Sequence, residues 1–398
     1  MRIAYISPFP PTWHGIATYT HYLNHALLKI DPEIESLIVA DSRTSGLATR
    51  KLTVVPCFAL AETLTEGEQP RDMDRVAQVV AEFAPDVIHI QHGPSVFCPD
   101  ERFLGLLERL RGQAKLVVTL HAVHTNETSR GLDMTMSMEE FNTGVGRLAD
   151  ATVVHQRSMK RELIRQGVPN QRVHVIAHGT EILRQVDVMS ARRSLGLPEN
   201  CRIIIAFGFF GDQKHMGLLI EALPRVLDKA PDCHLFVAGH VREWIREDHE
   251  KRKLYESLSQ RYGVQDRVLF AERFIVDDEI DLAFAAADLA AFPDRQDCLS
   301  ASGALHLALG AFKPVVVSRV PKFEEVWTEI SSEVTFDAES SSQLASILIR
   351  LLIDEDFRES IVLRVKSYAV RTAWEAIARD HLRLYDSLPV HRLVFARA

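Results

Sequence analysis

The sequence predicts an α/β fold made of two doubly wound, Rossmann-like domains. Short β-branched runs alternate with longer helical segments, which is the rhythm of βαβ units with a parallel sheet. This rhythm starts again near residue 202, after a connection over 184–200 that contains one helix. A chain of 398 residues is long enough for two such domains.

In the first half, apolar β-branched runs predict six strands. They are 2–7, 36–40, 86–91, 115–121, 151–156 and 173–178. Helical periodicity predicts five helices, at 16–30, 72–84, 101–112, 135–148 and 157–167. We expect these elements to form an N-terminal domain over residues 1–183.

In the second half, the same patterns predict a C-terminal domain over residues 184–369. Its strands are 202–208, 233–239, 267–272, 289–293 and 314–318, and its helices include 216–229, 277–286 and 302–312. The tail 355–389 is also helical, with Trp374 on an apolar stripe that is typical of packing. Its last part, about residues 370–390, is expected to pack back on the N-terminal domain.

Charge and cysteine content narrow the classes of function. The net charge of −8 disfavours nucleic acid as a partner, and it leaves peripheral membrane contact open. Five cysteines without CxxC spacing favour reduced thiols and a cytoplasmic protein. The apolar start MRIAYI is too short for a signal peptide, and no apolar run approaches the roughly 18 residues that span a bilayer.

Histidines and a glycine follow the predicted strands of the first half, at the ends where doubly wound sheets bind ligands. His92, His121 and His178 each end a strand, and Gly15 opens the first helix. The histidines either line a site or are structural, and their spacing gives no metal-ligand signature. Gly15 either lets a ligand approach backbone amides or forms a plain tight turn.

Two features of the second half favour phosphate binding. Lys214 ends a glycine-bearing loop, FGFFGDQK, from which an ammonium group can reach a phosphate, although a lone lysine is often only solvated. Ser302 and Gly303 begin a helix whose free amides attract anions, with a plain serine N-cap as the alternative. On equivalent faces of one domain, both features would bind a diphosphate.

Read together, these stretches resemble the retaining glycosyltransferases of family 4, which have the GT-B fold. The resemblance extends over nearly the whole chain and depends on the order and spacing of several pieces. They are PPTWHGIATYT, APDVIHIQH, VVTLH, VHVIAHG, AFGFFGDQKHMGLLIEAL, LFVAG and ALGAFKPVVVSRVP. The resemblance implies an N-terminal acceptor-side domain, a C-terminal donor domain, and sugar transfer from a nucleotide-diphosphate donor to a hydroxyl acceptor.

The resemblance also implies roles for residues of the N-terminal domain. His121 matches the family's active-site histidine near the transferring sugar. Gly15 falls in the glycine-rich loop near the donor phosphate and the acceptor. His14, His92 and His178 are expected on the acceptor side or along the cleft.

In the donor domain, the resemblance assigns Lys214 as the phosphate-binding lysine with a catalytic role. Further donor-binding positions, in which backbone amides hold the distal phosphate, are Ser302, Gly303 and Ala304. Phe274 and Ile275 fall where the base is usually sandwiched.

The chain departs from the family pattern near the donor. Phe209 or Phe210 stands where an arginine usually precedes the lysine loop. The usual two acidic residues, spaced eight apart, fall on Leu299 and Leu307, and Asp297 is the carboxylate nearest to the first position. The sequence is closer to a branch of family 4 with a Ser-Gly-x-Leu turn, so donor binding is rearranged or activity is lost.

Three functions follow from this reading. The first is a retaining glycosyltransferase, specifically a hexosyltransferase, that takes a nucleotide sugar and a carbohydrate, lipid-linked or small-molecule acceptor. The second is a catalytically lapsed GT-B protein that acts as a binding or partner subunit, and the third is another nucleotide-linked enzyme such as an epimerase or a phosphorylase. No cofactor and no metal are expected, since no DxD motif is present. The sugar, the base, the acceptor and the oligomeric state are not given by the sequence.

Overall fold

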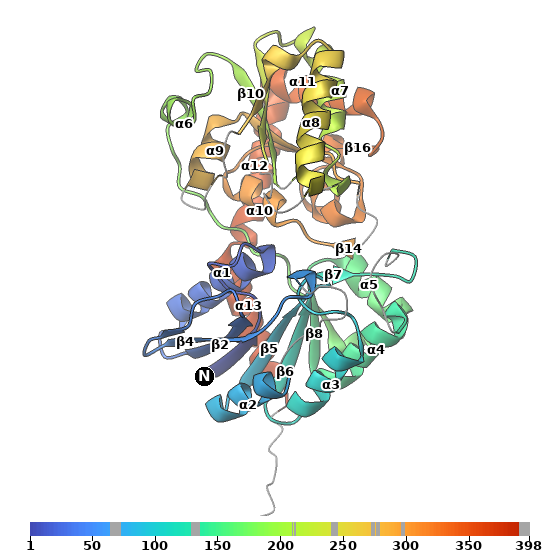
Figure 1. Ribbon diagram of the computed structural model, residues 1–398. Helices are drawn as coiled ribbons and strands as arrows, with labels where there is room; N and C mark the ends of the chain where they lie inside the picture. The colour runs from blue at the N-terminus through green and yellow to red at the C-terminus, as the bar shows by residue number, and fades with distance from the viewer. Residues whose placement is uncertain are drawn as a thin grey trace, which may run out of the picture. The chain divides into compact units, whose positions relative to one another are not determined.

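Two parallel sheets organise the chain, one in each of two units (Figure 1). The computed structural model describes residues 1–63, 73–128, 136–208, 210, 212–239, 246–271, 275, 279–295 and 299–389. Unit 1 consists of Met1–Gly179, Cys298–Ala301 and Trp374–Ala398, and unit 2 consists of Thr180–Asp297 and Ser302–Ala373.

Unit 1 contains the first nine strands. They are β1 (Arg2–Ile6), β2 (Glu35–Asp41), β3 (Leu47–Ala48), β4 (Leu52–Phe58), β5 (Val87–His92), β6 (Lys115–Leu120), β7 (Ala122–Val123), β8 (Ala151–Val154) and β9 (Val173–Val175), to which β14 (Leu299–Ser300) is added beside β7. The helices are α1 (Gly15–Ile30), α2 (Met73–Phe83), α3 (Glu101–Leu110), α4 (Met138–Leu148), α5 (Arg157–Arg165) and α13 (Trp374–Ser387).

The main sheet of unit 1 has the strand order β3-β4-β2-β1-β5-β6-β8-β9. Every neighbouring pair is parallel except β3 with β4. The chain first builds outward from β1 through β2 to β4, and then builds in the other direction from β5. The strand order therefore reverses between β1 and β5, and this position is the switch point of unit 1.

Alternate residues of β1 enter different cores, because successive side chains of a strand point to opposite faces. Ile3 and Tyr5 pack in the cluster that contains α1 and α13 residues. Ala4 and Ile6 pack in the cluster that contains residues of α2, α3 and α4. The sheet is thus buried on both faces, as expected for parallel strands joined by helical crossovers.

Unit 2 is a second doubly wound sheet. Its strands are β10 (Arg202–Phe207), β11 (Cys233–Ala238), β12 (Val268–Phe270), β13 (Leu289–Phe292), β15 (Val315–Ser318) and β16 (Thr335–Phe336). Its helices are α6 (Val188–Ser194), α7 (Gly217–Leu227), α8 (Arg246–Arg261), α9 (Ile280–Ala286), α10 (Gly303–Gly310), α11 (Ser341–Ile353) and α12 (Glu355–Arg371). The order β12-β11-β10-β13-β15-β16 is parallel throughout and reverses between β10 and β13, which is the switch point of unit 2.

Strand β4 is absent from the sequence-based prediction because Pro56 interrupts the run LTVVPCF. Proline is tolerated in a strand only where no neighbour needs its missing N–H. The outer neighbour β3 pairs with β4 only through Val54 and Thr53, so it ends before reaching Pro56. Helices α8 and α11 and the short strand β16 were also not predicted.

The helical tail is two helices and not one. Helix α12 ends at Thr372, whose amide donates to Tyr368 O, and α13 begins at Trp374. Helix α13 packs on α1 within unit 1, and the predicted apolar stripe is its buried face. Trp374 closes over Gly179, where an added Cβ would lie 2.3 Å from the indole ring. This close contact requires glycine, and it gives Trp374 the packing role that its stripe predicts.

The chain first enters unit 2 and last leaves it through neighbouring residues, with the return to unit 1 over residues 298–301 in between. Thr180 N donates to Thr372 O over 2.8 Å, and the two threonine hydroxyls are also 2.8 Å apart. The same Thr180 hydroxyl lies 2.7 Å from His306 Nδ1 on α10. The entry and exit of unit 2 are therefore bonded to each other and to α10.

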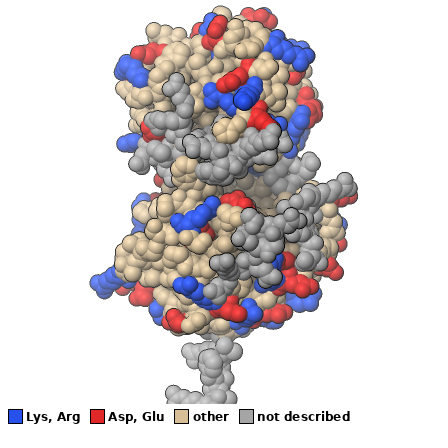
Figure 2. Space-filling view, viewed as in Figure 1, with Lys and Arg blue, Asp and Glu red and all other residues tan. Residues whose placement is uncertain are grey.

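The surface carries both signs of charge in mixture. Figure 2 shows Lys and Arg side chains interspersed with Asp and Glu side chains on the face that it draws. Within the described ranges, no helix combines the length and the apolar character that crossing a bilayer requires.

Candidate active site

The switch point of unit 2 joins the ends of its two central strands. Lys214 follows β10, and its ammonium Nζ lies 3.2 Å from Oδ2 of Asp294, which follows β13. The amide of Arg295 also donates to Gln213 O over 2.7 Å. Gly208 has a φ of +129°, and an added Cβ would lie 3.4 Å from Cε of Lys214. The backbone after β10 therefore needs a glycine, and the lysine side chain lies against it.

A second lysine reaches the same carboxylate from the next strand. Lys322 lies just beyond β15, in the short 3-10 turn Pro321–Phe323, and its Nζ is 2.8 Å from Asp294 Oδ2. The hydroxyl of Ser318, at the end of β15, donates to the backbone oxygen of Asp294 over 2.6 Å. We call Lys214, Asp294 and Lys322 the lysine–aspartate cluster. It is formed by the carboxyl ends of β10, β13 and β15.

The lysine–aspartate cluster is buried and contains two ammonium groups beside one carboxylate. The side chains of Lys214, Lys322 and Asp294 are 13%, 10% and 1% exposed. Burial, followed by repulsion from Lys322, lowers the pKa of Lys214 to about 8, against the attraction of Asp294. Burial opposes ionisation of Asp294, but the two ammonium groups together outweigh it and hold the pKa of Asp294 below its usual value.

Helix α10 begins after β13 and returns the chain to β15. In a crossover between parallel strands, the helix start lies at the carboxyl end of the first strand. Ser302 is the N-cap, and its hydroxyl accepts from Leu305 N over 3.2 Å. The amides of Gly303 and Ala304 have no intrahelical acceptor, as in the first turn of any α-helix. This helix start therefore has both a serine N-cap and backbone amides that are able to donate hydrogen bonds to an anion.

The remaining positions that the sequence analysis considered for binding the sugar donor are either buried in the core or lie outside the described residues. Ile275 is 8% exposed and belongs to the core of unit 2, so its side chain packs inward and does not present a face to a base. Leu307 packs against the same core. Phe274 and Asp297 lie outside the described residues.

At the switch point of unit 1, an uncharged histidine–serine pair joins the two loops. His14 is the N-cap of α1, and its Nδ1 accepts from Ile16 N over 3.1 Å. Its Nε2 therefore carries the proton and lies 2.9 Å from the hydroxyl of Ser95, in the loop after β5. Burial, and secondarily the charge of Arg43, lowers the pKa of His14 to about 4. At Gly15, an added Cβ would meet no atom within 4 Å, so packing does not require glycine there.

His121 belongs to a chain of polar contacts on one face of the sheet. Its Nε2 lies 2.9 Å from Gln91 Oε1 and its Nδ1 lies 3.2 Å from His155 Nε2. Gln91 also contacts His89, whose Nδ1 is 2.7 Å from the Tyr385 hydroxyl on α13. Both ring nitrogens of His121 are therefore engaged within unit 1.

The backbone carbonyl of Ile176 determines which ring nitrogen donates and which accepts in each of these hydrogen bonds. His155 Nδ1 faces Ile176 O at 3.1 Å, so it carries the proton, and His155 Nε2 must accept from His121. Burial, followed by the neighbouring histidines, lowers the pKa of His121 well below its usual value. A neutral His121 then accepts at Nε2, which requires the Gln91 side-chain amide to be turned so that its nitrogen donates.

His178 and His92 lie in different surroundings. His178 Nδ1 is 2.8 Å from Gly179 O, and its ring packs edge-to-face on Tyr19 within the aromatic group that includes Trp374. His92 is 2% exposed, and its ring packs among Phe97, Phe103 and Phe141. The prediction of His92 on the acceptor side is corrected, because His92 points with Ile88 and Ile90 into the opposite core from His89 and Gln91.

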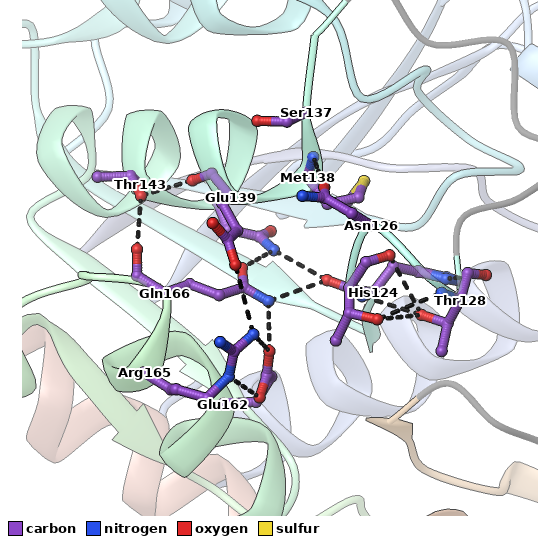
Figure 3. A network of polar contacts seen from close by, with 12 residues as sticks. His124, Asn126, Thr128, Ser137, Met138, Glu139, Thr143, Glu162, Arg165 and Gln166 are labelled. Atoms are coloured by element: carbon purple, nitrogen blue, oxygen red, sulfur yellow. Dashed lines mark hydrogen bonds and ion pairs between the residues drawn. The ribbon is translucent and has the colours of Figure 1, made fainter.

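The segment after β6 is bonded to α4 and to the end of α5 in its described part (Figure 3). His124 O accepts from Gln166 Nε2 over 3.1 Å, and Asn126 Oδ1 accepts from Met138 N over 2.9 Å. Thr128 closes a turn onto Thr125 N over 2.9 Å. These bonds hold the segment in place where it begins, at His124, and where it meets α4, at Met138.

Sequence reasoning missed Asp294, Lys322, His89 and Gln91. His89 and Gln91 could have been found from the alternation of β5, which places them on the face of Thr119 and His121 in the next strand. Asp294 and Lys322 follow strands, as Lys214 does, but only the spatial strand order brings these three ends together. In the described part of the chain, no three His, Cys, Asp or Glu side chains gather as a metal site would require.

Two family models match the chain in succession. Residues 13–183 match "Glycosyltransferase Family 4", and residues 187–367 match "Glycosyl transferases group 1". The chain is 26% identical over 203 residues to a D-inositol 3-phosphate glycosyltransferase of Corynebacterium urealyticum, which is 50% of this chain and 46% of that protein. It is 22% identical to a phosphatidyl-myo-inositol mannosyltransferase of Mycolicibacterium smegmatis, over 98% of this chain and 94% of that protein.

Solved structures show the same fold. A sucrose-phosphate synthase from Thermosynechococcus elongatus has a TM-score of 0.74 at 19% identity, covering 97% of this chain and 98% of its own. Anabaena HepE in complex with UDP and glucose has a TM-score of 0.71 at 18% identity, covering 98% and 100%.

The match spans about half the length of the first curated relatives, 46% and 58%. The two family models, however, lie end to end over nearly all of this chain, one on each sheet. With two Rossmann-like sheets and these two matches, the chain has the GT-B fold, with one glycosyltransferase family domain in each half.

Proposed function

We propose that this protein is a retaining glycosyltransferase that takes its sugar from a nucleoside diphosphate and binds that diphosphate at the switch point of unit 2. The observation that carries the proposal is the contact of Lys214 with Asp294 across that switch point. Ligands of doubly wound sheets bind where the strand order reverses. A buried ammonium group there fits a phosphate ligand.

The donor site is completed by the start of α10. The amides of Gly303 and Ala304 and the positive end of the helix favour the same kind of ligand as Lys214. A structural relative, Anabaena HepE, has been solved in complex with UDP-glucose, which makes uridine a reasonable first base to test. The named inositol phosphate and phosphatidylinositol relatives likewise suggest a polyol hydroxyl as the first acceptor to test.

In the proposed reaction, the bond between the anomeric carbon and the diphosphate oxygen breaks, and a bond from the acceptor oxygen forms on the same face of the sugar. Lys214 and the α10 amides stabilise the negative charge that develops on the departing diphosphate. The acceptor proton passes to an oxygen of that diphosphate, which replaces the general base. His121 of unit 1 is assigned a positioning role and no proton-transfer role, since both of its ring nitrogens are already bonded within unit 1.

The test is a screen of UDP, GDP and ADP sugars, first by thermal shift and then by release of the nucleoside diphosphate. A ligand that binds the folded state raises the midpoint of unfolding by mass action. We expect one sugar nucleotide to stabilise the protein and to be turned over when an acceptor is added, with the anomeric configuration retained in the NMR spectrum of the product. A protein that binds none of them contradicts the proposal, and inversion of the configuration contradicts its retaining part.

A further inference from the structure

A series of polar side chains leads from helix α13 through the core of unit 1 to His121. The hydroxyl of Tyr385 lies 2.7 Å from His89 Nδ1. Gln91 contacts His89 Nε2 over 3.2 Å on one side and His121 Nε2 over 2.9 Å on the other. Tyr385, His89 and Gln91 are completely buried, whereas His121 is partly exposed at the end of β6. We call these four residues the polar relay. It connects the core with the edge of the sheet at which doubly wound folds bind ligands.

This face of the sheet changes from apolar to polar toward the carboxyl ends of its strands. The apolar residues are Val87, Val117 and Val153, and the polar residues that follow them on or just after β5, β6 and β8 are His89 with Gln91, Thr119 with His121, and His155. Replacing both partners of a buried hydrogen bond by apolar groups of the same shape is nearly neutral or stabilising, so packing alone does not call for polar residues here. Their place at the ligand-binding edge indicates a function instead.

The hydrogen bonds of the polar relay run in one direction. His121 donates from Nδ1 and accepts at Nε2, so the amide nitrogen of Gln91 donates to it. The oxygen of Gln91 then faces His89 Nε2, which must carry a proton and shares it with the hydroxyl of Thr119, 2.7 Å away. Burial lowers the pKa of His89 well below its usual value, so this ring has one proton, and its Nδ1 accepts from Tyr385. The tautomer of His121 is therefore set by its partners on both sides.

We propose that Gln91 is a positioning residue that fixes the tautomer and the ring orientation of His121. Tyr385 acts on Gln91 through His89, so the C-terminal helix takes part in the same function. The inference rests on the proposed function, in which His121 has a positioning role, and it adds the groups that hold this histidine. A ring that donates from Nδ1 and accepts at Nε2 is uncharged, so it does not oppose the positive charge that the anomeric carbon gains as the diphosphate leaves.

The first test is nitrogen NMR spectroscopy of the free protein with isotope-labelled histidine, because the resonance of a ring nitrogen shows whether it carries a proton or accepts a hydrogen bond. The variant His121→Gln assigns the signals. We expect wild-type His121 to be protonated at Nδ1 and to accept at Nε2. In Gln91→Met, which keeps the volume of the side chain but not its amide, the Nε2 resonance should move to that of a nitrogen without a hydrogen bond. In Tyr385→Phe, the His89 resonances should change, and the His121 resonances should change by a smaller amount.

Tyr19→Phe is the matched control. The hydroxyl of Tyr19 is also buried on this side of the sheet, but it has no hydrogen-bond partner among the described residues. Its ring packs edge-on against the ring of His121, with the centroids 4.7 Å apart, and phenylalanine keeps this contact. The variant removes a buried tyrosine hydroxyl beside the same histidine without removing a hydrogen bond. The His121 resonances should therefore keep the wild-type protonation pattern.

The second test measures kcat and KM for the sugar nucleotide that wild-type protein turns over fastest. We expect Gln91→Met to lower kcat about tenfold and to change KM less than about threefold, since the orientation of His121 matters more in the transition state than in binding. Tyr385→Phe acts from further along the polar relay and should lower kcat about threefold. Tyr19→Phe should leave both constants within about twofold of wild type. If Gln91→Met does not fold, Tyr385→Phe tests the polar relay by the loss of one hydroxyl.

The possible failures are distinguishable. An unchanged Nε2 resonance of His121 in Gln91→Met would overturn the positioning role. A changed resonance with wild-type kcat would show that the polar relay is structural and has no part in transfer. Equal effects of Tyr19→Phe and Tyr385→Phe would assign the loss to core packing. If wild-type protein turns over no sugar nucleotide, the proposed function fails and the role in transfer fails with it, while the resonances still show whether Gln91 orients His121.

Discussion

At the switch point of unit 1, a neutral histidine bonds a serine, whereas at the switch point of unit 2 two lysines share one aspartate. Both contacts join the loop after the first strand of a sheet to the loop after the strand beside it. In unit 1 the pair is His14 and Ser95, and burial keeps the pKa of His14 at about 4. In unit 2 the corresponding pair is Lys214 and Asp294, with Lys322 added.

The comparison teaches that one topology is compatible with two electrostatic designs. In a neutral pair, the two side chains hydrogen-bond to each other, so they hold two loops together without a ligand. In the lysine–aspartate cluster, two buried ammonium groups instead contact one carboxylate oxygen. We therefore propose the charged switch point as the place where the donor diphosphate binds, whereas the neutral pair joins its two loops.

The largest expected effect is on folding, from Asp294→Asn. This change leaves two buried ammonium groups without a carboxylate, and we expect the free energy of unfolding to fall by about 3–5 kcal/mol. Urea denaturation followed by circular dichroism measures it. His14→Asn, at the neutral switch point, is the control and should cost less than about 1 kcal/mol, because asparagine is also a good N-cap. Similar losses for both variants would erase the distinction between the two sites.

Lys214→Met should reduce turnover next most strongly. It removes charge that stabilises the leaving diphosphate, and we expect kcat/KM for the donor to fall about 100-fold. The Lys322–Asp294 pair remains, so the fold should persist. Initial rates of diphosphate release measure the effect beside a Lys313→Met control, and wild-type kinetics in Lys214→Met would remove this lysine from the site. Lys313 is another largely buried lysine of unit 2, whose Nζ bonds Ala287 O over 2.7 Å at the opposite end of β15.

The two switch points should also differ in pH dependence. Lys214 has a pKa of about 8 in the free protein, and the groups that face it are Asp294 and Lys322. As pH rises through 8 the lysine loses its charge, so affinity for a nucleoside diphosphate should fall, by up to about tenfold per pH unit. Calorimetry between pH 7 and about 9.5 tests this. An equally steep fall in Lys214→Met would assign the titration to another group.

At the neutral switch point, the sensitive range of pH lies lower. The pKa of His14 is about 4 when folded and about 6.5 in an unfolded chain, so the unfolded state binds more protons between these values. The contribution of His14 to the free energy of unfolding should therefore be complete above about pH 6.5 and should be lost as pH falls toward 4. Comparing urea midpoints of wild type and His14→Asn at pH 4.5 and 7.5 isolates it. A constant difference between them would show that His14 does not titrate there.

The smallest expected effect on stability comes from Gly15→Ala. Since an added Cβ meets no atom within 4 Å, the free energy of unfolding should change by less than about 0.5 kcal/mol. If a ligand approaches this helix start, turnover should nevertheless fall, by about tenfold. Unchanged turnover in a stable variant would make Gly15 an ordinary turn residue.

Much of the fold follows from local pattern, because hydrophobic periodicity is written in neighbouring residues. The strands 86–91 and 289–293 correspond to β5 and β13 almost residue for residue. Strand β4 did not follow, since its Pro56 is acceptable only where its outer neighbour has already ended. That condition depends on where the short strand β3 stops pairing with β4, which the run of apolar residues does not show.

The candidate site was less predictable for the same reason. Lys214 and Ser302 stand at loop–helix starts that are readable along the chain. Asp294 and Lys322 are 28 residues apart and meet Lys214 only because β10, β13 and β15 are adjacent in space. His92 was placed wrongly because a histidine at a strand end was read without asking which face its position gives it.

The hydrogen-bonded threonines at the entry and exit of unit 2 have a practical consequence. Because Thr180 and Thr372 are bonded to each other, the first entry into unit 2 and the last exit from it are adjacent backbone points, although residues 298–301 return to unit 1 in between. Joining Gly179 directly to Trp374 would keep the indole against the glycine that it covers. The main sheet of unit 1, without β14, is thereby open to domain exchange, in which another unit 2 is grafted between these two residues.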